Sequence, residues 1–170
     1  MTSIQSEPAP VNFNLPTVQG SDTESATELF PEEDVVIDHS TFDQLVGICE
    51  DDDDNGEFLR TLIGDYFKQA ERTNEDMETA VSNQDFSQLA RLGHFLKGSS
   101  AALGIIKVKE SCEKLENFGQ LKDADGTNTI TETEAETRIR ELLAQVRLEN
   151  EEAETYLGPY CEDPTALAEE

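Results

Sequence analysis

Residues 89–104 read LARLGHFLKGSSAALG, and their apolar pattern decides the fold. The leucines recur at steps of three and four residues, which is the spacing of one side of an α-helix rather than the alternation of a half-buried strand. With about 100° of rotation per residue, Leu92, Leu96 and Leu103 fall within roughly 20° of one direction. The stretch therefore predicts an amphipathic helix that turns its leucines toward a core.

Two further helices are expected before this stretch. A short helix should begin after Asp38, with Ser40 or Thr41 as its N-cap, and a long helix should follow Gly56 and end near Asn83. Their expected core-facing residues are Phe42, Leu45, Val46 and Cys49 in the first helix, and Phe58, Leu59, Leu62, Ile63, Tyr66, Phe67, Ala70, Met77 and Val81 in the second.

The quoted helix and two later ones complete the predicted fold. Asp85 is a suitable N-cap for the quoted helix, and Gly104 suits the left-handed position after its end. A helix is expected at residues 105–119, and after the polar, turn-forming segment 122–129 comes a last helix whose apolar stripe ends at Leu157. The predicted class is all-α, an antiparallel up-down-up-down four-helix bundle with a short extra N-terminal helix.

Composition divides the chain into a folded domain and two tails. Residues 1–34 are rich in proline, serine, threonine and glutamate and should form a disordered tail, because they cannot bury enough apolar surface to offset their ordering entropy. Residues 35–158 are expected to form the bundle, and residues 159–170 a flexible acidic tail.

The net charge of −26 excludes several classes of function. It would repel the phosphate backbone of a nucleic acid and an anionic membrane surface. No run of apolar residues is long enough to span a bilayer, so a soluble intracellular protein is expected. Three widely spaced cysteines suggest neither a disulfide framework nor a zinc site, and we expect reduced thiols, two of them in the core.

His94 is the residue with the clearest chemistry. It lies opposite the leucines of its helix, so it is expected to be exposed, with Lys97 and Gly98 one turn further on. A neutral imidazole nitrogen is a nucleophile that can take up a phosphoryl group, and a nearby ammonium can balance the phosphoryl charge. Glycine leaves room above the helix for a partner to approach. His39, beside a predicted helix start, is expected to have a surface role only.

The sequence HFLKGSSAALG, residues 94–104, resembles the phosphorylation motif of histidine phosphotransfer (HPt) domains, especially of fungal phosphorelay intermediates. LARLGHFLKG before it and SCEKLENFG after it strengthen the resemblance. It implies that His94 accepts a phosphoryl group from a receiver-domain aspartate and passes it to the aspartate of a second receiver. Lys97 would contact the phosphoryl group, and Gly98 would provide clearance for the receiver.

The resemblance also implies partners and a docking surface. The partners would be the receiver domains of a hybrid sensor histidine kinase and of response regulators, and the chain would act in the cytoplasm and nucleus. Separately from the resemblance, its small size and exposed working face suggest a monomer. Relatives commonly have an amide where Glu116 stands and a basic residue where Gln120 stands, so the role of these two positions is open. The implied docking residues are Leu45, Leu62, Asp65, Gln69 and Phe95.

No intrinsic cofactor, metal site or kinase activity is expected. The chain contains no P-loop, kinase glycine-rich loop or Rossmann fingerprint, so it should not be an enzyme that phosphorylates itself, and Mg²⁺ should come from the receiver. Residues 51–56 match the first half of a calcium loop, but Leu62 stands where its bidentate glutamate is required. Two alternatives stay open: a scaffold bundle that docks receivers without carrying phosphate, and a phosphatase or other phosphohistidine-dependent enzyme.

Overall fold

Five helices form the part of the chain that the structure, a computed structural model, describes, namely residues 35–50 and 56–162. All of these residues belong to one unit, Glu32–Glu170. The expected N-terminal tail 1–34, residues 163–170 of the expected C-terminal tail 159–170, and the acidic segment 51–55 lie outside the described residues. The helices are α1 (His39–Glu50), α2 (Glu57–Ser82), α3 (Phe86–Ala102), α4 (Ile106–Gly119) and α5 (Glu132–Glu162). The predicted all-α class is confirmed.

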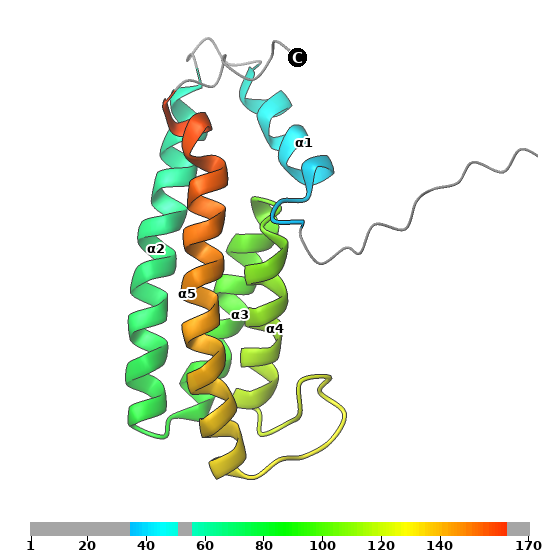
Figure 1. Cartoon of the computed structure of the whole chain (residues 1–170), viewed down its shortest axis with the longest axis vertical. Helices are drawn as coiled ribbons and strands as arrows, with labels where there is room; N and C mark the ends of the chain where they lie inside the picture. Colours follow the sequence, from blue (N-terminus) through cyan, green and yellow to red (C-terminus); the bar gives the residue numbers. More distant parts are fainter. Residues whose placement is uncertain (1–34, 51–55, 163–170) are drawn as a thin grey trace, which may run out of the picture. The chain divides into compact units, whose positions relative to one another are not determined.

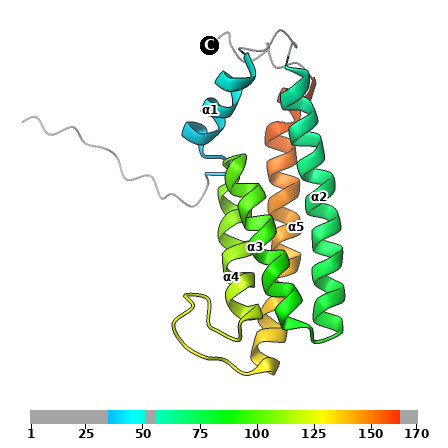
Figure 2. The same ribbon diagram turned by 180° about the vertical axis from the view of Figure 1, so that it is seen from behind.

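The four longer helices form an antiparallel bundle, as predicted (Figures 1 and 2). Each packs against the next along the chain, and α5 returns to pack against α2. One cluster of buried apolar side chains fills the space between them. Its largest fully buried members on these helices are Leu59, Ile63, Met77, Leu89, Leu96, Leu115, Ile139 and Leu157.

The start of α1 differs from the expectation that Ser40 or Thr41 caps it. The cap is Asp38, whose Oδ1 accepts a hydrogen bond from the Ser40 amide at 3.0 Å and whose Oδ2 accepts one from the Thr41 hydroxyl at 2.7 Å. Ser40 and Thr41 lie inside the first turn and donate to the cap. The Asp38 carboxylate, directly before the first helical residue His39, reaches the first unsatisfied amides of the helix, so it takes the capping position.

Buried contacts attach α1 to the bundle. Phe42 is fully buried and packs edge to face against Tyr160 of α5, with ring centroids 4.7 Å apart. Ile37, just before the helix, forms a bridge with Ile105. Gly104 has φ +73°, and a Cβ there would lie 2.8 Å from the carbonyl oxygen of Asp38, so the left-handed glycine predicted after α3 also admits the chain entering α1.

One residue assigned to the core side of α2 is not in the core. Phe58 is 53% exposed, whereas its neighbour Leu59 is buried. Successive residues point about 100° apart on a helix, and the buried side of α2 is set by Leu59, Ile63 and Tyr66. Phe58 instead shares a face with Leu62, four residues further on.

The last helix is longer than predicted. α5 passes through Gly158 and Pro159 and ends at Glu162, so the expected boundary after residue 158 falls inside the helix. Tyr160 and Cys161 pack against the core, and this packing offsets the hydrogen bond that proline cannot donate. The Gly-Pro pair predicted a helix end, and the packing of the residues that follow it overrides that local preference.

Cys49 and Cys112 are buried and Cys161 is partly buried, as expected of reduced thiols of which two lie in the core. Within the described residues, no helix is both long and apolar enough to span a membrane.

Candidate functional site

His94 points away from the core of the bundle, as the sequence predicts. Its side chain is 70% exposed, whereas Leu89 and Leu96 on the other side of α3, and Leu103 directly after the helix, are buried. The ring is therefore held on a helix whose opposite side is locked by packing. A reacting atom on such a helix is accessible and well positioned.

The structure brings Lys97 and Gly98 to the turn that follows His94. Lys97 lies against α4, with a side chain that is 25% exposed. Gly98 is exposed, and a Cβ placed on it would meet no heavy atom within 4 Å. Arg91, one turn before the histidine, donates instead to the Gln88 side chain at 2.7 Å. Lys97 is thus the cation that shares an acidic partner with the imidazole.

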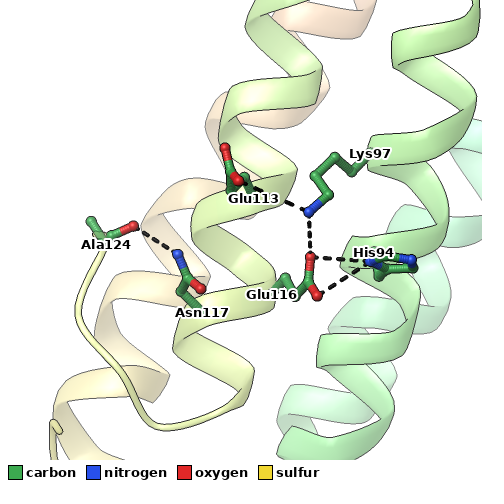
Figure 3. A network of polar contacts seen from close by, with 6 residues as sticks. All are labelled: His94, Lys97, Glu113, Glu116, Asn117 and Ala124. Carbon is green, nitrogen blue, oxygen red and sulfur yellow. Dashed lines mark hydrogen bonds and ion pairs between the residues drawn. The ribbon is translucent and has the colours of Figure 1, made fainter. Parts of the chain in front are cut away.

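That partner is Glu116 of α4, which contacts both His94 and Lys97 (Figure 3). His94 Nδ1 lies 3.2 Å from Glu116 Oε1 and 3.3 Å from Oε2. Lys97 Nζ donates to Glu116 Oε2 at 2.7 Å, and Glu113 lies at 4.0 Å from the same Nζ. We define the cluster of His94, Lys97 and Glu116 as the histidine site.

Two glycines allow α3 and α4 to approach closely enough to form the histidine site. A Cβ on Gly93 would lie 3.1 Å from the Glu116 amide nitrogen, and a Cβ on Gly119 would lie 2.7 Å from the Ala90 amide nitrogen. Sequence reasoning assigned Gly93 no role and Gly119 only a helix end. It also named Glu116 as a departure from relatives without placing it against the imidazole. The sequence does contain a signal for this close approach, namely a glycine on each helix: Gly93 next to His94, and Gly119 about one turn after Glu116.

Interactions within the site keep both Glu116 and Lys97 charged. Partial burial raises the pKa of Glu116, but hydrogen bonds from Lys97 and His94 outweigh burial and leave it below its usual value. The hydrogen bond to Glu116 raises the pKa of Lys97 despite an opposing effect of burial. Near neutral pH the cluster therefore contains a carboxylate and an ammonium.

Gln120 does not belong to this cluster. It is the exposed C-cap of α4, one turn beyond Glu116. A hydrogen bond connects the loop that follows to α4: the Asn117 side-chain amide donates to the Ala124 carbonyl at 2.9 Å (Figure 3).

The expected docking residues lie on three helices. Leu45 of α1 and Leu62 of α2 are half-buried against the core, while Asp65 and Gln69 share the face of Leu62. Phe95 of α3 is 51% exposed beside His94. Two exposed apolar residues that sequence reasoning did not select for docking are Ile48 of α1 and Phe58 of α2.

An antiparallel helical bundle with an exposed histidine, followed one turn later by a lysine and a glycine, defines the class of histidine phosphotransfer modules. The chain belongs to the Hpt domain family, whose model matches residues 61–149, more than half of its length. The resemblance seen in residues 94–104 is thereby confirmed.

Fungal phosphorelay proteins are among its relatives. The chain is 41% identical over 128 residues to multistep phosphorelay regulator 1 of Schizosaccharomyces pombe, covering 75% of this chain and 43% of the relative. It is 34% identical over 86 residues to phosphorelay intermediate protein YPD1 of Saccharomyces cerevisiae, covering 50% of each. These matches span half or less of the length of each relative.

Solved structures of YPD1 share the fold. The crystal structure of the yeast phosphorelay protein YPD1 matches with a TM-score of 0.63 and 26% identity, over 75% of this chain and 96% of that one. A co-crystal structure of Saccharomyces cerevisiae Ypd1 with the receiver domain of its downstream response regulator Ssk1 matches with a TM-score of 0.64 and 28% identity, over 76% and 96%.

Proposed function

We propose that this chain is a phosphorelay intermediate that accepts a phosphoryl group on His94 from a receiver-domain aspartate and passes it to the aspartate of a second receiver. The observation that carries the proposal is the exposed imidazole on α3, with an ammonium beside it and open space above Gly98. Membership of the Hpt family and likeness to proteins named as phosphorelay intermediates support it.

The division of chemistry between the partners follows from the site. Phosphoryl transfer depends chiefly on positioning and on neutralising charge. The chain supplies a nucleophile and a lysine, and in the described residues no three histidine, cysteine or acidic side chains gather as metal ligands would. The receiver supplies Mg²⁺ and the remaining catalytic groups, and the chain acts without kinase activity of its own.

Receiver domains of a hybrid sensor kinase and of response regulators are the proposed partners. The docking surface comprises Leu45, Leu62, Asp65, Gln69 and Phe95. The exposed apolar residues Ile48 and Phe58 lie on the same two helices as Leu45 and Leu62 and support it, since exposed apolar side chains often mark protein interfaces. The chain acts as a monomer in the cytoplasm and nucleus.

Incubation with a phosphorylated receiver domain tests the proposal. Wild-type protein should take up label that is acid-labile and alkali-stable, as a phosphohistidine is, and His94→Gln should take up none. His39→Gln is the matched control, because it removes the other histidine and should leave the label in place. Equal labelling of His94→Gln and wild type would refute the assignment.

A further inference from the structure

A long groove runs between α2 and α5, which lie side by side in Figure 1. Its volume is about 770 Å³, within the usual range of small-molecule sites. The ion pair between Glu78 and Arg147, at 2.8 Å, fixes the antiparallel register of the two helices. With a rise of about 1.5 Å per residue, the α2 side of the groove from Gly64 to Glu75 is roughly 16 Å long. The groove therefore has room for an extended small molecule.

The walls of the groove carry more negative than positive charge. Four exposed glutamate side chains line it without an ion pair or hydrogen bond to the described residues, and they are Glu71, Glu75, Glu151 and Glu154. Two cations also line it, and both lie close to other carboxylates. Lys68 is 3.9 Å from Asp65. Arg147 is paired with Glu78. The groove therefore attracts a cation.

A buried amide in the groove needs a hydrogen-bond donor. Asn74 lines the groove with 4% of its surface exposed, and its side-chain oxygen has no hydrogen-bond partner within the described residues. Asn150, which also lines the groove, differs because its oxygen accepts from the Tyr66 hydroxyl and its nitrogen donates to the Val146 carbonyl, both at 3.0 Å. A buried acceptor without a donor costs free energy. A ligand that donates to Asn74 is therefore favoured in the groove.

These lining groups select a ligand with several separated ammonium groups. Carboxylates and the Asn74 oxygen only accept hydrogen bonds, and ammonium groups only donate them. In the part of the chain that the structure describes, no three acidic, histidine or cysteine side chains gather as ligands of one metal ion would. A peptide segment fits less well, since each of its residues adds a backbone carbonyl that needs a donor of its own.

We propose that the groove between α2 and α5 binds a linear polyamine. The ammonium groups of the polyamine pair with the glutamates of both walls, and one of them donates to Asn74. The methylene segments between them lie on the apolar surface of Phe67. Gly64 and Gly158 keep the groove open, because a Cβ at either position would meet no heavy atom within 4 Å. This inference goes beyond the proposed relay function.

The groove is separate from the surface proposed for the relay. Glu71 on the groove side of α2 is nine residues from Leu62 of the docking surface, so the two point about 180° apart. His94 contacts Glu116 of α4, and the α3–α4 pair lies across the bundle from the α2–α5 pair (Figure 2). A bound polyamine therefore leaves His94 and the docking surface uncovered.

Isothermal titration calorimetry of the full chain with spermine, at physiological ionic strength, tests the site. Wild type should bind one spermine, and Glu71→Gln combined with Glu154→Gln should weaken binding by about tenfold. Glu132→Gln combined with Glu141→Gln is the matched control, because it removes the same charge from exposed positions of α5 outside the groove. The control should stay within about twofold of the wild-type affinity.

Asn74→Leu tests the buried acceptor, because leucine keeps the approximate shape of the side chain and removes its oxygen. This change should weaken spermine binding by about tenfold. It should not lower the thermal transition of the free protein, since the oxygen that it removes has no partner within the described residues. Putrescine, which has only two ammonium groups, should bind more weakly than spermine.

Three results would overturn the inference. Equal weakening by the two pairs of glutamine substitutions would show that spermine responds only to the net charge of −26. Unchanged spermine affinity in folded Asn74→Leu would remove the role of the buried amide. Tighter binding of a trilysine peptide than of spermine would indicate a peptide site instead. None of these measurements involves phosphoryl transfer, so they test the groove independently of the relay function.

Discussion

Gly119 at the end of α4 lies directly against Ala90 of α3. A Cβ on Gly119 would come within 2.7 Å of the Ala90 amide nitrogen and 2.9 Å of its Cα atom. Backbone atoms at such distances cannot rotate away as a side chain can. The close approach of α3 and α4 therefore depends on the missing side chain, and with it the contact between Glu116 and His94.

Gly119→Ala should destabilise the protein, although alanine normally favours a helix. Forcing a methyl group into this contact should lower the free energy of unfolding by about 1–3 kcal/mol. Gly98→Ala is the matched control, because its site is open. That change should raise the free energy of unfolding by about 0.5–1 kcal/mol, the usual gain for replacing glycine inside a helix. Urea unfolding measures both, and two changes of the same sign would contradict the packing argument.

The helices and the direction of His94 could be predicted from sequence because both depend on local periodicity. The leucines of α3 fix the buried side, and the ring follows on the other side. The caps at Asp85 and Gly104 could also be predicted, because capping depends only on residues within one turn of the helix end. The Asp85 side chain accepts a hydrogen bond from the Gln88 amide at 2.9 Å.

Contacts between distant segments could not be predicted in the same way. Glu116 meets His94 only because α4 packs beside α3, and nothing in the local pattern around residue 116 reports that pairing. The continuation of α5 through Pro159 depends on packing of Tyr160 against Phe42 of α1. Local propensity predicted a helix end there, and tertiary packing overrode it.

Tyr66→Phe should weaken the bundle by breaking a buried polar network. The Tyr66 hydroxyl donates to Asn150 Oδ1 at 3.0 Å and lies 2.9 Å from Ser100 Oγ, and all three residues are buried. Leaving these groups without their partner should cost about 1–3 kcal/mol of unfolding free energy. Tyr156→Phe is the control, because its hydroxyl pairs with His39 at an exposed position. Equal losses of unfolding free energy in Tyr66→Phe and Tyr156→Phe, measured by thermal or urea unfolding, would contradict a stabilising role for the buried network.

Lys97→Met should raise the pKa of Glu116, because it removes a hydrogen bond and a positive charge that lower it. The ion pair contributes to stability above the ordinary glutamate pKa of 4.5, and the contribution is lost as the pH falls through the lowered value in the folded protein. A ¹³C titration of the Glu116 carboxyl group measures the change. Lys107→Met, which removes the lysine paired with Glu152, should leave the Glu116 titration unchanged.

Native alkylation should distinguish the cysteines. Burial, with a smaller contribution from Glu149, raises the pKa of the Cys112 thiol to about 12, so at pH 8 it has very little of the reactive thiolate. Cys161 is only partly buried. Mass spectrometry after a brief iodoacetamide treatment should show Cys161 modified well before Cys112, and similar rates once the protein is unfolded. Equal rates in the native protein would show that Cys112 is accessible.

The most direct test of the central claim is a reconstituted relay with two purified receiver domains, the first phosphorylated and the second not. Wild-type protein should carry label from the first receiver to the second, with labelled His94 appearing in between. His94→Gln should transfer none, although it still binds both receivers. Label that reaches the second receiver equally fast with His94→Gln would contradict the account and would favour a scaffold that brings receivers together without carrying the phosphoryl group.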